Sequence, residues 1–132
     1  MSMVRCLFRL LLVLWAGSLW SLAAWVAPTL FLAQSDRQLA GILAARLFSM
    51  ETYVGLGAAA FALLLPERRR FTWGYAAAGL LAVNEWALKP VMTAAHAAGS
   101  AAGLSFGAWH GVSAVLYVGA CVAVAVPILK RE

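Results

Sequence analysis

Charge is what this sequence has least of. Of its 132 residues, only 11% are Asp, Glu, Lys or Arg, while 64% are hydrophobic. A soluble globular domain is about half apolar and about a quarter charged. A chain this short exposes much of its surface whatever its fold, so the surplus of apolar side chains must face lipid or a partner protein. Lipid is the simpler solvent, and the composition predicts an integral membrane protein.

Cysteine and histidine are also scarce, with two of each. Cys6 and Cys121 fall toward the cytoplasmic side of the topology predicted below, where thiols stay reduced, so we expect no disulfide. The spacings His-x-x-x-His and Cys-x-x-Cys are missing, and so are a nucleophile with its base, a phosphate loop and the paired carboxylates of a soluble active site. The sequence offers no support for an enzyme.

Long apolar blocks are what the sequence does have. A helix needs about 20 apolar residues to cross roughly 30 Å of hydrocarbon, and none of the blocks alternates as a barrel strand does. Because helices satisfy their own backbone groups in lipid, we predict an all-α fold: a four-transmembrane-helix bundle, up-down-up-down, forming a single domain over residues 1–132. The expected helices cover residues 7–32, 36–65, 70–98 with a kink at Pro90, and 104–129.

Basic residues sit at the ends of these blocks rather than in one patch, which argues against a nucleic-acid partner despite the formal charge of +5. An inside N-terminus leaves only Arg37 in the outer loops, and the bias of basic residues toward the inside favours that orientation. We therefore expect both termini in the cytoplasm and a multi-pass protein of the bacterial inner membrane. The residues expected inside are Arg5, Arg9, Arg68, Arg69, Arg70, Lys130 and Arg131.

The N-terminal segment has two arginines before an apolar run, as a signal peptide does. The run is too long for a usual signal core and contains Trp15, Trp20 and Trp25. We interpret it as a retained helix.

Local signals place the helix ends. Ser35 is expected to cap the second helix, with Gln38 returning the hydrogen bond as a capping box. Pro90 is expected to kink the third helix, because proline removes a backbone hydrogen bond. The break before the fourth helix is expected at residues 99–100, Gly-Ser.

Four glycines are expected to share one face of the fourth helix. Small residues at steps of four let helix backbones approach closely. We favour close packing within the bundle, and keep open a homo-oligomer or a membrane partner on the same face. The glycines are Gly103, Gly107, Gly111 and Gly119.

Ionisable residues inside the apolar blocks are the candidate binding site. Each costs about 2.5 to 3.5 kcal/mol at a helix centre on insertion scales, so each must pair or reach water. Glu85 precedes Lys89 by four residues, the favoured order for a pair on one helix face. On the predicted orientation the set converges on the outer half of the bundle. The candidates are Arg46, Glu51, Asn84, Glu85, Lys89 and His110.

We expect Arg46 to pair with Glu85 or Glu51, and Asn84 and His110 to supply further hydrogen bonds. Two interpretations follow. The pairs either only lock the bundle, or they form a pocket, open to the outside, that binds or transports a small solute, ion or lipid group.

No cofactor is predicted. A haem or copper site would need ligands such as His96, His110, Met50 and Met92 to converge, and the histidines are few. Haem or copper binding is kept as an alternative function, as is the role of an assembly or accessory membrane subunit.

An ordered set of short motifs resembles a known family. The motifs are Gly17 to Trp20, Ala27-Pro28-Thr29-Leu30-Phe31, Ala40-Gly41, Arg46-Leu47-Phe48 with Glu51, Lys89-Pro90, and Phe106 to Ser113. They resemble domain of unknown function 4149, a family of small bacterial four-helix membrane proteins that is similar to the eukaryotic transmembrane protein 205. The resemblance implies a four-helix bundle with an uncharacterised biochemical role. The eukaryotic branch is associated with platinum-drug resistance and secretion, which implies metal handling or export. More remotely, the architecture resembles membrane proteins of copper resistance and haem biosynthesis.

Overall fold

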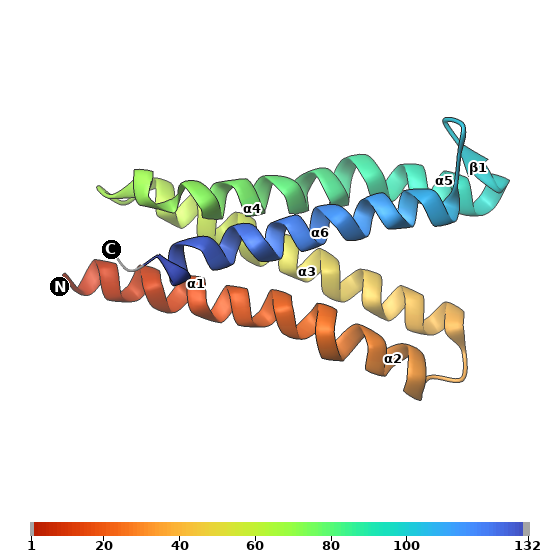
Figure 1. Ribbon diagram of the computed structural model, residues 1–132, viewed down its shortest axis with the longest axis horizontal. Helices are drawn as coiled ribbons and strands as arrows, with labels where there is room; N and C mark the ends of the chain where they lie inside the picture. Colours follow the sequence, from red (N-terminus) through yellow and green to blue (C-terminus); the bar gives the residue numbers. More distant parts are fainter. Residues whose placement is uncertain (1, 131–132) are drawn as a thin grey trace.

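A computed structural model describes residues 2–130, which form four helical rods (Figure 1). The first rod joins α1 (Met3–Ser21), the π-helical turn η1 (Leu22–Val26) and α2 (Ala27–Ala33). The second is α3 (Arg37–Leu63). The third joins the 3-10 turn η2 (Arg68–Phe71), α4 (Thr72–Val83), the π-helical turn η3 (Asn84–Leu88) and α5 (Lys89–Ala98). A hairpin of β1 (Ser100–Ala101) and β2 (Leu104–Ser105) leads into the fourth, α6 (Phe106–Leu129).

The start of α1, the end of α6 and the turn η2 lie at one end of the bundle, and the hairpin lies at the opposite end (Figure 1). Among residues 2–130, three helices are long and apolar enough to cross a membrane: Met3–Ala33, Arg37–Leu63 and Phe106–Leu129. The third rod carries Glu85 and Lys89 in its middle. Arg131, expected among the inside basic residues, lies outside the described residues.

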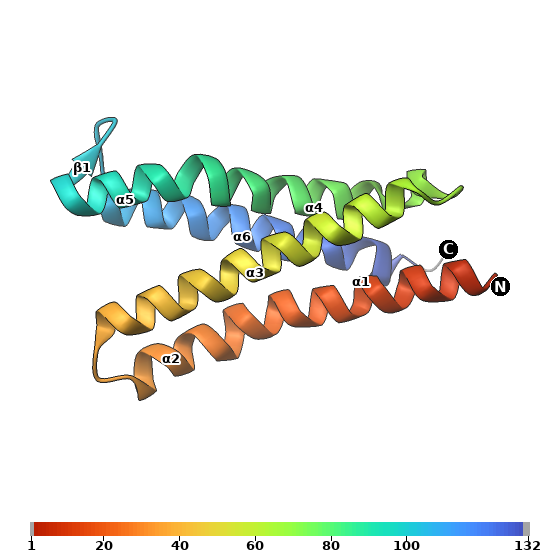
Figure 2. The ribbon, with the colours of Figure 1, turned by 180° about the vertical axis from the view of Figure 1, so that it is seen from behind.

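The core fills the half of the bundle that contains η2. Its buried side chains come from α1, α3, η2, α4 and α6. Two hydrogen bonds tie α1 to α6 beside this core: the Tyr117 hydroxyl donates to the Leu19 carbonyl over 2.7 Å, and the Trp20 indole donates to the Cys121 carbonyl over 3.1 Å. Toward the other end, α2 and α3 diverge from α5 and α6 in both views (Figures 1 and 2).

Each interrupted rod places a π-helical turn directly before a proline. η1 ends two residues before Pro28, and η3 ends two residues before Pro90. Proline lacks an N–H and its ring clashes with the carbonyl four residues earlier, and a π-turn relieves both by widening the helix by one residue. The kink expected at Pro90 is therefore a π-turn just before it, and the helix continues to Ala98.

Three helix ends show how the local signals act. Asp36, not Ser35, caps α3, since its carboxylate accepts from the Gln38 and Leu39 amides over 2.9 and 3.2 Å. The prediction was wrong by one residue because Ser and Asp are equally good caps. α5 ends at Gly99, which has a left-handed φ of 82°. α6 begins at Phe106 rather than at residue 104, because the hairpin occupies residues 100–105.

The close packing within the bundle that was expected along the glycines of the last helix is largely wrong, whereas a homo-oligomer or membrane partner on that face stays a prediction. Gly103 lies in the hairpin turn with a φ of 79°, outside the helix. Gly107 and Gly111 are exposed, and a Cβ added at Gly111 would meet no atom within 4 Å. Only at Gly119 does a neighbouring helix come close, with Leu80 Cδ1 3.3 Å from an added Cβ. Helical periodicity cannot predict which face of a helix its neighbours cover.

The closest approach to a glycine of α3 is at Gly55, where the buried Trp15 indole of α1 lies against the backbone. A Cβ at Gly55 would stand 2.4 Å from Trp15 Cζ2. We predict that Gly55→Ala lowers the apparent melting temperature of the detergent-solubilised protein, because overpacking costs about 1–3 kcal/mol. Gly57→Ala is the matched control, since nothing lies within 4 Å of its added Cβ. Equal melting temperatures for the two variants would contradict this account of the interface.

Candidate functional site

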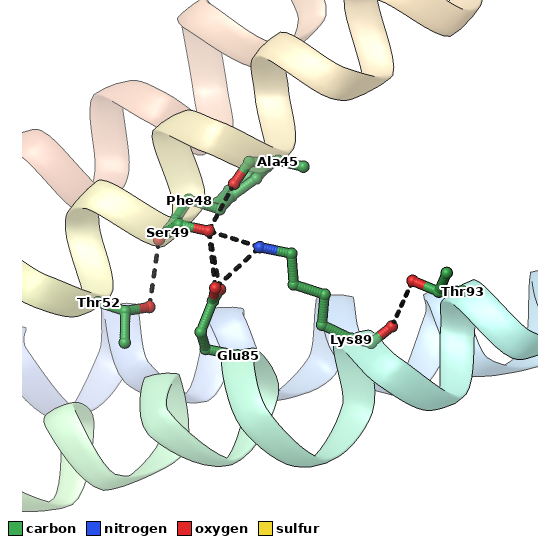
Figure 3. Close-up of polar contacts among 7 residues, drawn as sticks. All are labelled: Ala45, Phe48, Ser49, Thr52, Glu85, Lys89 and Thr93. Atoms are coloured by element: carbon green, nitrogen blue, oxygen red, sulfur yellow. Dashed lines mark hydrogen bonds and ion pairs between the residues drawn. The ribbon is translucent and has the colours of Figure 1, made fainter.

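Ser49, Glu85 and Lys89 form one polar cluster between α3 and the η3–α5 segment (Figure 3). The Lys89 ammonium donates to Glu85 Oε1 over 2.8 Å and to Ser49 Oγ over 2.7 Å. Ser49 Oγ lies 2.9 Å from each Glu85 carboxylate oxygen and 3.0 Å from the Ala45 carbonyl. Because a hydroxyl has one hydrogen, Ser49 donates to one of these acceptors at a time. The cluster is compact and bridges two rods.

The carboxylate and the ammonium of this cluster differ in exposure. The Glu85 side chain is 14% exposed, whereas that of Lys89 is 41% exposed. An ammonium group carries three donors, and two of those on Lys89 are used within residues 2–130. The third donor is available on the exposed side, so the cluster can offer a hydrogen bond and a positive charge to a small group that approaches it.

Glu85 and Lys89 form the ion pair that their spacing predicted. The predicted pairing of Arg46 with Glu85 or Glu51 was wrong. Among the described residues, Arg46 makes no ion pair with either carboxylate, and its side chain is exposed on α3. Lys89 and Ser49 take the place that Arg46 was expected to fill at Glu85. A sequence gives the depth of an arginine in a span but not the direction in which it points.

Glu51 belongs to a different contact, between α3 and α1. It is buried, with 8% of its surface exposed, and one of its oxygens accepts a hydrogen bond from the Ser18 hydroxyl. Its other oxygen has no partner among the described residues, and neither does the nearby buried Trp15 indole N–H. Glu51 is therefore separate from the cluster it was expected to join.

Asn84 and His110 also lie apart from that cluster. Ser113 Oγ donates to the Asn84 side-chain oxygen over 2.6 Å, and Asn84 Nδ2 donates to the Ser113 carbonyl over 3.3 Å, which ties η3 to α6. The exposed His110 ring stacks on Phe106 at a centroid distance of 6.0 Å, and the His96 ring meets the same Phe106 ring edge-on at 5.0 Å. Among residues 2–130, His110 makes no hydrogen bond to the charged residues it was expected to join.

The residues considered for a metal do not gather. Within residues 2–130, no three side chains of His, Cys, Asp or Glu come together in a way that could hold an ion. Both histidine rings contact Phe106, and Met50 has 61% of its surface exposed. The arrangement brings no support to the haem or copper alternative.

Sequence reasoning missed the three serines that complete these contacts, Ser18, Ser49 and Ser113. Hydroxyl side chains in helices commonly bond to the carbonyl four residues earlier, as Thr52 does to Phe48 and Thr93 to Lys89. A serine inside a span therefore carries no signal of its own. The one signal in the sequence was the predicted depth of each serine in its helix, because a hydrogen-bond partner must lie at the same depth as the charged residue on the neighbouring helix.

Together, the apolar rods and the polar contacts buried between them define a multi-pass helical membrane protein. The chain belongs to the family described as Domain of unknown function (DUF4149), which matches residues 10–101. Comparisons with curated proteins and with solved structures find no match. The matched residues include Ser49, Glu85 and Lys89 but stop before α6. The resemblance to the eukaryotic transmembrane protein 205 stays a prediction.

The ion pair gives a prediction about stability. Lys89→Met leaves the poorly exposed Glu85 carboxylate with only the Ser49 donor, and we expect it to destabilise the protein by about 1–3 kcal/mol. Glu85→Gln in the same chain should recover part of this loss, because no charge is then left unpaired. Thermal unfolding in detergent of the wild type, both single variants and the double variant measures the coupling. An additive double variant would show that the pair is not coupled.

Proposed function

We propose that this protein spans the bacterial inner membrane four times and that its Ser49–Glu85–Lys89 cluster binds a small solute, ion or lipid group from the outer side. The observation that carries the proposal is the partly exposed Lys89 side chain, whose ammonium uses two of its three donors within residues 2–130 and pairs with the Glu85 carboxylate. The ligand should offer an acceptor oxygen or an anionic group to this donor.

The depth of the cluster supports the outward direction. Lys89 lies ten residues before Gly99, the turn at the hairpin end of the third rod, which is about 15 Å along a helix. The cluster lies in the half of the bundle where α2 and α3 diverge from α5 and α6 (Figures 1 and 3). The other half contains the apolar core, which argues against a continuous polar path through one subunit.

The charges at the two ends support the orientation. Among the described residues, the end with η2 carries Arg5, Arg9, Lys130 and the basic residues 68–70, whereas Arg37 lies at the opposite end. Basic loops stay on the cytoplasmic side. With Arg46 exposed in the outer half of α3, its long side chain can extend toward the outer headgroups, so it needs no carboxylate partner.

The third rod is interrupted and carries two opposite charges, which oppose its insertion into a membrane. Glu85 and Lys89 neutralise each other, however, and both are bonded to Ser49 of α3. Charged residues inside spans are tolerated where they pair and face the interior of a bundle. The third rod packs against α6 and α3 along its α4 segment, so it inserts together with its neighbours.

A labelling experiment tests the outward opening. In a background with Cys6→Ser and Cys121→Ala, Ser49→Cys should react with a membrane-impermeant thiol reagent added to intact cells, more slowly than Arg37→Cys, which lies in the outer loop region. Arg68→Cys should react only after permeabilisation, and the fully buried Ala62→Cys should not react at all. Reaction at Ser49→Cys only after permeabilisation would refute an outward-facing site.

A copurification experiment tests binding. Small molecules extracted from the detergent-solubilised wild type should include a species that is depleted about tenfold or more in Lys89→Met, because a charge-assisted hydrogen bond contributes about 1.5–3 kcal/mol. Arg37→Gln is the matched control, since it removes a cation remote from the cluster. If the stably folded Lys89→Met and Glu85→Gln variants carry the same species as the wild type, the cluster only locks the bundle.

A further inference from the structure

The end of the bundle opposite the proposed solute site contains a cavity of about 420 Å³ lined by basic side chains. Arg5 and Arg9 reach it from α1, Arg69 and Arg70 from η2, and Lys130 from the residue after α6. Three segments that are far apart in the sequence therefore aim their cations at one space. The volume falls within the range of about 300–1,000 Å³ that small-molecule sites occupy.

Among residues 2–130, one carboxylate, that of Glu67, lines the cavity against these five cations. It accepts from Arg5 Nε over 3.0 Å and pairs with Arg70 Nε over 3.2 Å, so it joins α1 to η2. Arg9 and Arg69 have no carboxylate partner among residues 2–130. The cavity thus keeps an excess of positive charge after its internal pairs are made.

The remaining wall of the cavity is apolar apart from Thr72. Phe8 and Leu12 from α1, Phe71 and Trp73 near the start of α4, and Pro127 from α6 line it. Lys130 Nζ stands 5.9 Å from the centre of the Trp73 ring, within reach of a cation–π contact. A site that is basic on one side and apolar on the other suits an anion that carries an apolar part better than a fully hydrophilic anion.

We propose that this cavity binds a phosphate group, and that the phosphate belongs to the headgroup of an anionic membrane lipid. Arginine matches phosphate through parallel N–H donors, and basic pockets between spans at the membrane surface bind lipid headgroups. The lipid's phosphate lies among Arg9, Arg69 and Lys130, and its glycerol end lies against Phe8 and Leu12. The proposal does not depend on a ligand at Lys89.

A topogenic role alone, in which the basic residues only orient the chain in the membrane, is the competing explanation. It predicts that neighbouring arginines of the turn are equivalent. The cavity predicts that they differ, because Arg69 lines it and Arg68 does not. Arg68→Gln and Arg69→Gln remove the same charge from adjacent positions of one turn, which makes them a matched pair.

The experiment measures lipid binding to the full chain in detergent, with phosphatidylglycerol as the anionic probe and phosphatidylcholine as the neutral one. The wild type should prefer phosphatidylglycerol. Arg9→Gln and Arg69→Gln should each weaken its binding about fivefold, from about 1 kcal/mol per basic residue near a lipid surface. Arg68→Gln should bind as the wild type does, and Arg69→Lys, which keeps the charge but not the paired donors, should weaken binding less than Arg69→Gln does. All variants are compared by size-exclusion elution, and Arg69→Lys keeps the test valid if Arg69→Gln does not fold.

Inorganic phosphate distinguishes the two sources of the anion. If millimolar phosphate leaves phosphatidylglycerol binding unchanged, the lipid headgroup is the ligand. If phosphate alone binds the wild type but not Arg69→Gln, and displaces the lipid, the cavity is a phosphate site supplied from solution. Equal weakening by Arg68→Gln and Arg69→Gln, or equal binding of the two lipids, would overturn the proposal.

Discussion

A polar atom left without a partner in an apolar interior loses more free energy than most side-chain contacts return. In a chain with so few charged residues, this cost governs where most buried polar groups lie, the second Glu51 oxygen and the Trp15 indole N–H being exceptions among the described residues. Tyr117 and Trp20 find backbone carbonyls on the neighbouring rod, and Asn84 finds Ser113. The hydrogen bonds that satisfy these groups are therefore also the ties between the rods. Apolar packing brings the helices together, and the polar side chains determine their register.

The two halves of the bundle obey this constraint differently. In the half with η2, the core is apolar and the rods lie close, with Trp15 packed against Gly55. In the other half the rods diverge, and Ser49, Glu85 and Lys89 bridge them. At the η2 end, five basic residues and Glu67 line one cavity. The molecule therefore has two candidate binding sites, the Ser49–Glu85–Lys89 cluster and the basic cavity at the η2 end, whereas the sequence indicated only one, in the outer half.

Features that depend on composition or on spacing within one helix could be predicted from the sequence. The apolar blocks showed the helical rods, and the spacing of Glu85 and Lys89 showed their pairing. Features that depend on how a helix is rotated against its neighbours could not. Among the described residues, neither Arg46 nor Glu51 bonds to Glu85, and Gly111 has no neighbouring helix close to it. The basic cavity was hidden for the same reason, because its residues come from three segments that only the fold brings together.

The π-helical turns before Pro28 and Pro90 have a further effect on the rods that contain them. A π-turn adds one residue to a helix, and one residue corresponds to a rotation of about 100° about the helix axis. The stripe of side chains that faces the core on one side of the turn is therefore not continued on the other side. Each interrupted rod therefore has two inward-facing stripes that are rotated relative to each other. The residues that build the core and the residues that line the other half of the bundle can be substituted independently of one another.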